Sequence, residues 1–451
     1  MSTNMHLPYA SKAYNIDFML LYNIKQIVQI VDDETTHLTG DAMNKIKILN
    51  CPESKLAILC KHGIVTQVGT YNECNNEDLP LGIVDKVDCK GGCVLPGFVD
   101  GHSHPVFAGD RVHEFAMKLA GATYMEVQSA GGGIHFTTQK TREAKEISLI
   151  QDFLLIATEM LRSGTTLLEA KSGYGLNIET ELKMLRVLNV ASKSTPLEVS
   201  ATFCGAHAIP SGSTEEKQTQ LIVDEILPEI KRIKQENDDL ETLENIDVFC
   251  EKNVFEIESS RKILMAGKKA GLRINFHADE LSQLGGAELA AEIKGAAVSH
   301  LEEISEQGIH DLSKSGTVAV LLPTTAYVLR LKPPPARKMI DAGVCVALGS
   351  DFNPNAYCYS MPMVMNFACV LFKMSMSEAL VAATLNAAHS LNRGKTHGAI
   401  GVGRVADFVV LSTSNWEHLI YRMGCHQNLI SHVIKAGKVV QSTVYAKTCQ
   451  K

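Results

Sequence analysis

Histidines and acids gather at four points in this sequence, each directly after a short apolar run. Residues 100–104 have the sequence DGHSH, residues 277–280 are HADE, residue 300 is a histidine, and residues 349–351 are GSD. Imidazole and carboxylate groups are the ligands that Zn²⁺ and similar divalent ions take in proteins. A single histidine at the end of a strand is more often a hydrogen-bonded core residue, so a metal site requires that these points meet in space.

His102 and His104 are the most informative pair, because alternate side chains of an extended segment point the same way. If the fold brings them near His277, His300 and Asp351, the cluster offers three or four imidazoles and a carboxylate around one centre. A divalent metal there, with an open position for water, lowers the pKa of that water toward ~7 and supplies hydroxide at neutral pH. The pattern therefore predicts a metal-dependent hydrolase.

A hydrolytic site also needs a group that moves protons. Glu280 stands three residues after His277, where it can take a proton from water and later give it to the leaving nitrogen. His300 could then polarise the carbonyl that is attacked. An acid at position 280 could instead be a surface residue at a helix N-terminus, so Glu280 is a candidate for the acid and base.

The four points must be positioned by strands that end side by side. Short apolar runs alternate with longer helical patterns through the middle of the chain, which is typical of parallel βα units. We expect strands at residues 94–99, 165–169, 198–203, 246–249, 273–276, 296–299, 317–322 and 344–348. We expect helices at residues 147–162, 178–191, 219–235, 256–270 and 286–294. Pro228 could split or kink the third of these helices.

Eight such units within about 310 residues suit a (β/α)8 barrel of the TIM type, and a doubly wound open sheet is the main rival. Both ends of the chain instead show short strands and turns, at residues 24–31 and 57–68 and again at 406–411 and 433–440. We therefore expect a barrel over residues 96–403 and one small β-sandwich domain built from residues 1–95 and 404–451.

Composition narrows the classes of function. The 451 residues carry 43 basic and 50 acidic side chains, a net charge of −7, so the positive field that binds nucleic acid is missing. No uninterrupted apolar run approaches the ~18 residues of a membrane span, and the N-terminus does not have the pattern of a secretory signal. The 12 cysteines are scattered and are expected to be reduced thiols. We expect a cytoplasmic protein that binds neither nucleic acid nor membrane.

The stretch LPGFVDGHSHP at residues 95–105, with the later His277, His300 and Asp351, resembles the amidohydrolase superfamily. More narrowly, nearly the full length of the chain is similar to the branch of that superfamily that opens a cyclic amide in histidine degradation. The segments that carry this resemblance are VFAGDR (106–111), AGGGI (130–134), KSGYG (171–175), GAH (205–207), NFHADE (275–280), SHLE (299–302) and LGSDFNP (348–354).

The resemblance implies hydrolysis of the small molecule 4-imidazolone-5-propanoate to N-formimidoyl-L-glutamate, with one divalent ion per subunit, Zn or Fe. It places the metal on His102, His104, His277 and Asp351. It assigns catalysis to Glu280, His300, His207 and Asp351. It lines the substrate pocket with Arg111, Tyr124, Tyr174, His207, Glu280, Asn353 and Asn355. An arginine suits the propanoate tail, and tyrosine or histidine suits the edge of a flat polar ring.

The same resemblance shapes the expected mechanism. We expect the activated water to attack the ring carbonyl, His207 or His300 to stabilise the oxyanion, and Glu280 to carry the proton before the ring C–N bond breaks. Some amidohydrolases bridge two metals with a carboxylated lysine on the fourth strand. Lys171 follows the second strand instead, so we expect a single metal, and Glu251 is the nearest candidate ligand for another.

Further expectations concern the surroundings of the site. The resemblance suggests a homodimer, and the glycines at 131–133 suggest a mobile loop. Ser103 stands where threonine is frequent, and Asn355-Ala356 stands where many bacterial members have glycine and a small hydroxyl residue. Neither departure touches a proposed ligand.

Two other functions stay open on the sequence alone. A deaminase of an aminoimidazole or a nucleobase would use the same metal to expel ammonia, although Arg111 favours a substrate with a carboxylate. A metal-free barrel that acts as a scaffold or assembly protein belongs to a different class. Such relatives typically lose metal histidines that this chain keeps.

Overall fold

The barrel strands expected from the sequence form one parallel sheet. The computed structural model describes residues 18–75, 84–121, 132–236 and 239–442. Within these residues the strands follow one another in chain order. They are β8 (Phe98–Asp100), β9 (Thr165–Lys171), β10 (Glu198–Ala206), β11 (Leu243–Cys250), β12 (Arg273–Ala278), β13 (Ala297–His300), β14 (Val318–Leu321) and β15 (Val346–Leu348).

The segments that follow β8 and β15 join the two ends of this sheet. The N–H of Gly101 donates to the carbonyl of Leu348, and the N–H of His104 donates to the carbonyl of Phe352 at 2.8 Å. A bridge between Ser103 and Phe352 lies in the same seam. The predicted (β/α)8 barrel is therefore confirmed, and the open doubly wound sheet is wrong.

The first predicted strand, residues 94–99, is divided between two sheets. β7 (Cys93–Pro96) pairs with β16 (Phe408–Leu411) outside the barrel, and β8 begins two residues later. Pro96 has no N–H with which to continue a ladder. A Cβ on Gly97 would lie 2.3 Å from Oγ1 of Thr166 on β9, so only glycine allows this close approach. The proline and the glycine thus end one sheet and start the next.

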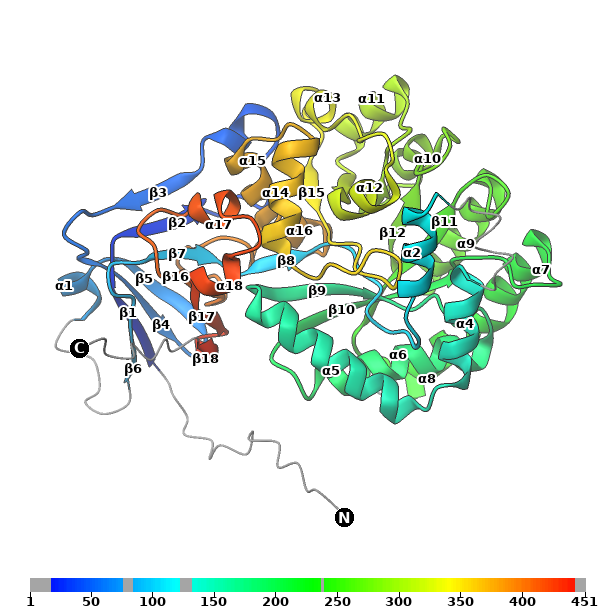
Figure 1. The fold of residues 1–451 in the computed structure, drawn as a ribbon, viewed down its shortest axis with the longest axis horizontal. Helices are drawn as coiled ribbons and strands as arrows, with labels where there is room; N and C mark the ends of the chain where they lie inside the picture. Colours follow the sequence, from blue (N-terminus) through cyan, green and yellow to red (C-terminus); the bar gives the residue numbers. More distant parts are fainter. Residues whose placement is uncertain (1–17, 76–83, 122–131, 237–238, 443–451) are drawn as a thin grey trace, which may run out of the picture.

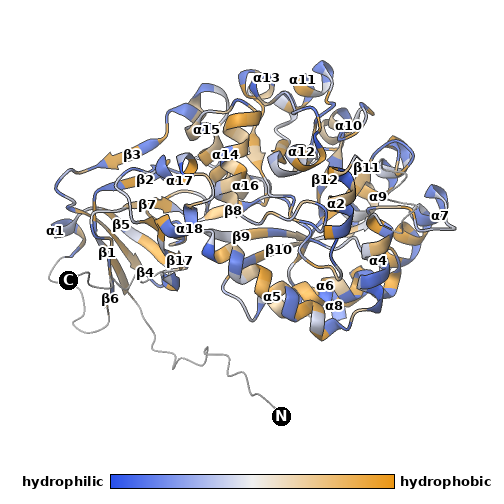
Figure 2. Cartoon of the chain, viewed as in Figure 1, coloured by the Kyte–Doolittle hydropathy of each residue, from blue (hydrophilic) through white to orange (hydrophobic). Residues whose placement is uncertain are grey.

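Helices cover the outside of the barrel (Figure 1). Up to β15 they are α2 (Val112–Leu119), α4 (Ile134–Glu143), α5 (Glu146–Arg162), α6 (Ile178–Ser192), α7 (Glu215–Gln220), α8 (Leu227–Glu236), α9 (Ile257–Lys269), α10 (Gly286–Glu292), α11 (Glu306–Ser315), α12 (Pro323–Leu329) and α13 (Ala336–Asp341). On α5, Leu149, Phe153 and Met160 are buried at helical spacing. One face of the helix therefore packs on the strands. Hydrophilic and hydrophobic residues alternate along both α5 and α8 (Figure 2).

The helix expected over residues 219–235 is interrupted near Pro228. A π-helical turn, η2 (Leu221–Ile226), lies between α7 and α8, and Pro228 stands in the first turn of α8. A proline ring clashes with the carbonyl four residues earlier in a regular α-helix. The wider turn just before the ring accommodates it, in agreement with the expected break.

The two ends of the chain build two further sheets beside the barrel. One has the order β5-β4-β1-β6, and the other has the order β18-β17-β16-β7-β2-β3 and mixes both ends of the chain. Their remaining strands are β1 (Phe18–Ile24), β2 (Gln26–Ile30), β3 (Lys47–Asn50), β4 (Leu56–Lys61), β5 (Ile64–Thr70), β6 (Val84–Asp88), β17 (Ile430–Lys435) and β18 (Lys438–Ser442).

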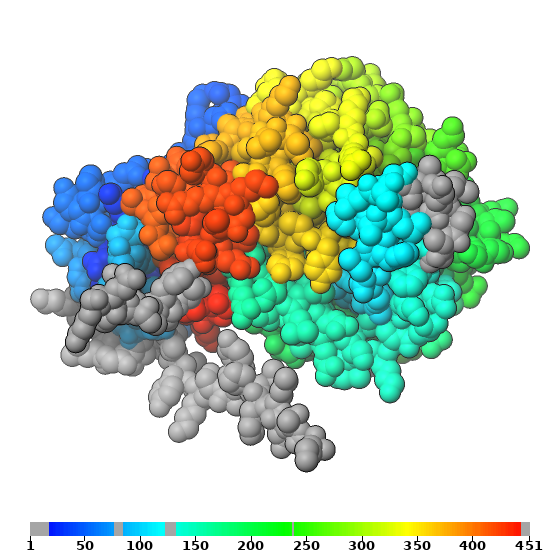
Figure 3. All heavy atoms as spheres, in the orientation of Figure 1, coloured from blue at the N-terminus to red at the C-terminus, as the bar shows by residue number. Residues whose placement is uncertain are grey.

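These two sheets share one core. Met19 and Ile58 from the first sheet lie in one buried cluster with Phe408 and Ile434 from the second, as in a sandwich. Figure 3 shows the red C-terminal residues packed against the blue N-terminal part of the chain. The predicted small β-sandwich from both termini is confirmed, whereas the exact domain limits at residues 95 and 403 stay a prediction.

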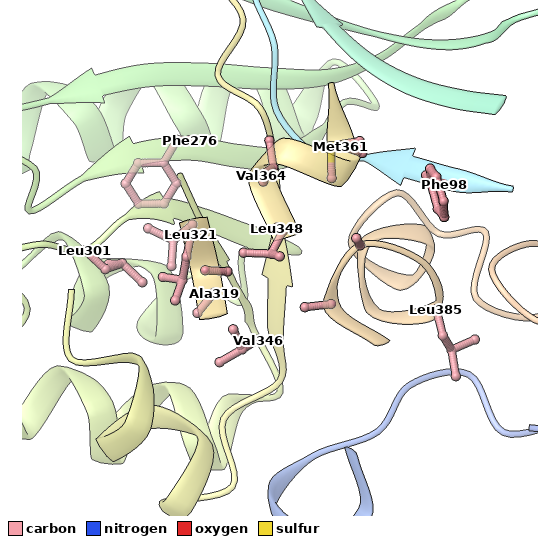
Figure 4. Packing of buried hydrophobic residues seen from close by; sticks show 14 of the residues in the cluster. Phe98, Phe276, Leu301, Ala319, Leu321, Val346, Leu348, Met361, Val364 and Leu385 are labelled. Atoms are coloured by element: carbon pink, nitrogen blue, oxygen red, sulfur yellow. The ribbon is translucent and has the colours of Figure 1, made fainter. Parts of the chain in front are cut away.

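The main core fixes the ends of the barrel strands. Figure 4 shows Phe276, Leu321 and Leu348 from three strands in one buried cluster with Met361 and Val364 of α14 (Met361–Leu371). Full burial of each such side chain contributes about 1.5–3 kcal/mol. The polar residues at the strand ends are therefore held on a rigid support.

Among the described helices, none combines the length and the apolar character that a membrane span requires.

Candidate active site

The ends of β8, β12 and β15 bring four ligand groups to one point. Nε2 of His277 lies 3.2 Å from Nε2 of His102 and 3.2 Å from Nε2 of His104. Oδ1 of Asp351 lies 3.5 Å from each of the same two nitrogens. Ligand atoms 2.0–2.1 Å from a tetrahedral zinc ion lie about 3.3 Å apart. The four residues therefore fit one divalent metal.

The outer nitrogens of the imidazoles fix the direction of the inner ones. Nδ1 of His277 donates to Oδ1 of Asp247 on β11 at 2.9 Å, and Nδ1 of His102 lies 2.8 Å from Oγ of Ser299 on β13. When Nδ1 is the donor, Nε2 presents a lone pair to the centre, which is what a metal ligand requires. Nδ1 of His104 is buried and has no hydrogen-bond partner among the described residues.

Asp351 is held from its far side. Oγ1 of Thr325 on α12 donates to Oδ2 of Asp351, which leaves Oδ1 toward the histidines. The backbone of Asp351 has a φ of +48°, in the left-handed region that aspartate tolerates better than most residues. Burial raises the pKa of its carboxyl group, and a nearby cation acts in the opposite direction.

Glu280 and His300 form a second pair beside the ligand cluster. Oε2 of Glu280 lies 3.6 Å from Nε2 of His300, and Nδ1 of His300 lies 3.6 Å from Oε2 of Glu302. Burial and the nearby carboxylate of Glu302 raise the pKa of Glu280 above its ordinary value. Burial disfavours the charged form of His300, but the two flanking carboxylates outweigh it and raise the pKa of His300. Glu280 can therefore take up or release a proton near neutral pH, while His300 stays protonated there.

His207 follows β10, and its ring stacks on that of His104 with centroids 4.8 Å apart. Nδ1 of His207 lies 3.1 Å from the carbonyl oxygen of Gly173. A carbonyl only accepts, so Nδ1 carries the proton of this ring. Burial lowers the pKa of His207 to about 4, so the ring is neutral at pH 7 and Nε2 is an acceptor. The buried ring of Tyr174 lies 5.3 Å from that of His207.

The site opens into one cavity of about 360 Å³, the size of a small-molecule pocket. Its walls include Arg111, Asn353 and Asn355 as well as His207, Glu280 and the candidate metal ligands His104, His277 and Asp351. Nε and Nη2 of Arg111 donate to the two carboxylate oxygens of Glu114 at 2.9 and 2.7 Å. Nζ of Lys118 donates to Oδ1 of Asn355 at 2.5 Å. Arg111 therefore lines the cavity as one partner of an ion pair, and Lys118 bonds to Asn355 of the same wall.

Four residues flagged by the sequence lie outside the described residues or make other contacts. Tyr124 lies outside the described residues, as does Gly131 of the glycine run. Nζ of Lys171 forms ion pairs with Glu169 and Asp247. Glu251 accepts the N–H groups of the chain just after Glu280, at Leu281 and Ser282, so it supports that turn.

Asp247, Ser299 and Glu302 are contributors that the sequence reasoning missed. Glu302 is 1% exposed, and no described residue hydrogen-bonds to either of its carboxylate oxygens. The signal for Asp247 was an acid inside the apolar strand IDVF, since a charge in a buried strand requires a partner. The partner itself, Nδ1 of His277, is thirty residues away and no local pattern indicates it.

A (β/α)8 barrel with three histidines and an aspartate at its strand ends defines a class of metal-dependent hydrolase. The chain belongs to the amidohydrolase family, whose model matches residues 93–440. Within that family the chain falls among sequences named probable imidazolonepropionase. Such relatives are 53% identical over 422 residues in Danio rerio and 50% identical over 425 residues in Homo sapiens. Each alignment covers 94% of this chain, and 96% and 99% of the relatives. The resemblance inferred from the motifs is confirmed.

Solved structures share the fold at low sequence identity. Guanine deaminase from C. acetobutylicum has a TM-score of 0.67 and 15% identity, covering 94% of this chain and 100% of that one. An adenosine deaminase from Xanthomonas campestris, with bound zinc, has a TM-score of 0.65 and 18% identity, covering 93% and 92%. At this identity the likeness concerns the fold alone and does not favour a deaminase.

Proposed function

We propose that this protein hydrolyses the ring amide of 4-imidazolone-5-propanoate to N-formimidoyl-L-glutamate, the third step of histidine degradation. The observation that carries the proposal is the placement of the three-histidine, one-aspartate cluster and Glu280 on a cavity that Arg111 also lines. The relatives named imidazolonepropionase, similar over nearly the whole chain, support this choice of substrate.

The metal ligands are His102, His104, His277 and Asp351, and the ion is zinc or iron. A divalent ion in such a site makes water a nucleophile at neutral pH and polarises the carbonyl that the water attacks. The inward lone pair on Nε2 of His277 and the inward Oδ1 of Asp351 support this set of ligands.

Glu280 takes the proton of the attacking water and returns it to the ring nitrogen that leaves. Its burial beside other carboxylates supports this role, because a raised pKa lets the group both accept and donate near neutral pH. His300 donates from Nε2 to the carbonyl oxygen of the substrate as negative charge develops there. The carboxylates of Glu280 and Glu302 on either side favour its protonated form.

His207 is assigned a different role from His300. Its only ring proton is used by the carbonyl of Gly173, so Nε2 cannot donate to an oxyanion. We assign Nε2 of His207 to accept an N–H of the substrate ring. Stacking on His104 holds the ring in this orientation.

Arg111 binds the propanoate carboxylate. Two of its five guanidinium N–H groups bind Glu114, so the other three are available for charge-assisted hydrogen bonds to the substrate. Tyr174, Asn353 and Asn355 line the same cavity and are assigned to substrate binding together with Arg111, as is Tyr124.

We further assign the protein to the cytoplasm as a homodimer. Light scattering of the purified protein tests the dimer.

Product analysis tests the reaction. Freshly generated 4-imidazolone-5-propanoate is incubated with the protein, and the products are identified by mass spectrometry together with an ammonia assay. Gain of one water without ammonia is the expected result. Release of ammonia would show a deaminase instead, and an unchanged substrate would refute the assignment.

A further inference from the structure

Lys171, at the end of β9, has a side chain with no exposed surface. Burial of an ammonium ion is costly unless the ion is paired and hydrogen-bonded. Nζ of Lys171 lies 2.7 Å from Oε1 of Glu169 and 2.7 Å from Oδ2 of Asp247, and both carboxylates are equally buried. Thr202 of β10 also donates to Glu169. Three adjacent barrel strands thus contribute to one buried ionic cluster.

Asp247 connects this cluster to the metal ligands. One of its oxygens pairs with Lys171, while Oδ1 accepts the backbone N–H of His277 at 3.0 Å and Nδ1–H of the same residue at 2.9 Å. Nζ of Lys171 faces Oδ2 of Asp247, and the backbone N–H of His277 binds Oδ1. Both of these groups can only donate, so Asp247 is the acceptor on each oxygen and does not donate to His277. Nδ1 of His277 is therefore the donor, and its Nε2 turns toward His102 and His104.

Stability alone does not account for such a cluster. Buried ion pairs are often no better for folding than apolar side chains of similar volume. Two carboxylates and one ammonium leave a net negative charge directly behind the ring of His277. A carboxylate behind a ligating imidazole fixes the ring and raises its basicity as a metal ligand.

We propose that Lys171 is a positioning residue for the metal site. Through Asp247 it holds His277 in its ligand orientation and so sets the affinity of the site for its divalent ion. The inference rests on the proposed function only for the presence of a metal, because neither the substrate nor its conversion enters the argument.

The test compares a double variant that keeps the net charge of the cluster with a matched single variant. K171M alone leaves two buried carboxylates without a cation and is expected to unfold. K171M/E169Q removes one charge of each sign, and the matched control E169Q keeps the pair between Lys171 and Asp247. Zn²⁺ affinity is measured by competition with a chromophoric chelator, on metal-stripped protein that circular dichroism shows to be folded.

We expect the double variant to bind Zn²⁺ roughly 10–100-fold more weakly than the native protein, and E169Q to bind it within about threefold of native. Native affinity in the folded double variant would overturn the role of Lys171. An equal loss in E169Q would also overturn it, by showing a general disturbance of the core. A native protein that binds no Zn²⁺ would instead contradict the metal site on which the proposed function depends.

Discussion

The backbone N–H of Asp351 donates to the carbonyl oxygen of His102 at 2.9 Å. This bond lies in the seam that joins the first and last barrel strands, so two proposed ligands from distant parts of the chain are linked directly. The hydrogen bonds that close the barrel therefore also bring two of the proposed metal ligands together. The site depends on the complete barrel rather than on any local motif.

Removal of one ligand should abolish metal binding. His277→Ala deletes the ring that lies 3.2 Å from both His102 and His104, and we expect loss of stoichiometric metal and of activity. Elemental analysis after gel filtration measures the metal. His310→Ala, at an exposed position on α11, is the control and should keep it. Full metal content in the His277 variant would refute this ligand set.

Glu280→Gln should separate proton transfer from metal binding. Loss of a general acid and base lowers turnover by about 10²–10⁴-fold, so we expect kcat to fall in that range while metal content stays unchanged. Steady-state kinetics on metal-loaded protein measures it. Glu258→Gln changes an exposed acid on α9 and should leave kcat as it was. A kcat within tenfold of native in the Glu280 variant would remove Glu280 from the mechanism.

Arg111→Met should act on substrate binding more than on chemistry. Hydrogen bonds to charged groups contribute about 1.5–3 kcal/mol, so we expect KM to rise roughly 10–100-fold with a smaller change in kcat. The discriminating measurement uses an imidazolone that has no propanoate chain. Native and variant should convert that compound equally. If the variant lost as much activity toward the shortened substrate as toward the full one, Arg111 would not act on the propanoate chain.

Glu198 couples the barrel to the small domain and should make stability depend on pH. At the start of β10 it accepts from Nζ of Lys435 at 2.9 Å and from Nε2 of His397 at 3.0 Å. Burial disfavours its charge, but these two partners outweigh burial and hold the pKa of Glu198 well below its ordinary range. Its contribution is therefore full above the unfolded pKa of about 4.3 and is lost as the pH falls below it.

We expect Glu198→Gln to lower the free energy of unfolding by about 2 kcal/mol at pH 7, between the values for surface and buried pairs. The difference from native should shrink as the pH falls below about 4. Urea unfolding at pH 7 and at a pH below about 4 measures this difference in the free energy of unfolding. Glu241→Gln, which changes an exposed acid, is the control. A difference that grows in acid would contradict the direction of the pKa shift.

Gly97→Ala should destabilise the junction between β7 and β8. The new Cβ would meet Oγ1 of Thr166 at 2.3 Å, and overpacking of a core costs about 1–3 kcal/mol. Thermal unfolding of Gly97→Ala, Thr166→Ala and the double variant forms a cycle. The double variant should be more stable than the sum of the single changes predicts. Additive losses would mean that this contact is not the cause.

The barrel was predictable because alternating apolar runs and helical patterns repeat through residues 165–348, where each strand is buried on both faces. The candidate positions for a metal site could be recognised because polar side chains directly follow those runs, and the structure brings His102, His104, His277 and Asp351 close together. The split at Pro96-Gly97 was not, because the apolar run is continuous and the change of partner depends on Asp407, whose carbonyl accepts the N–H of Gly97.

The residues that hold the candidate ligands in place could also not be predicted from the sequence. Lys171 was considered as a metal bridge and rejected, and the positioning role proposed for it depends on Asp247, which comes from a different strand. The sequence likewise left open whether His207 or His300 stabilises the oxyanion. The contact between Nδ1 of His207 and the carbonyl of Gly173 supports the proposed choice of His300, and that contact joins the ends of two strands.

The most direct measurement follows the ultraviolet absorbance of 4-imidazolone-5-propanoate with the native protein, after a chelator has removed the metal, and again after Zn²⁺ or Fe²⁺ has been restored. The account predicts loss of the ring chromophore with the native protein, none after chelation, and recovery with the restored ion. Unchanged turnover in protein shown by elemental analysis to be metal-free would contradict the account, as would no turnover by folded, metal-loaded protein.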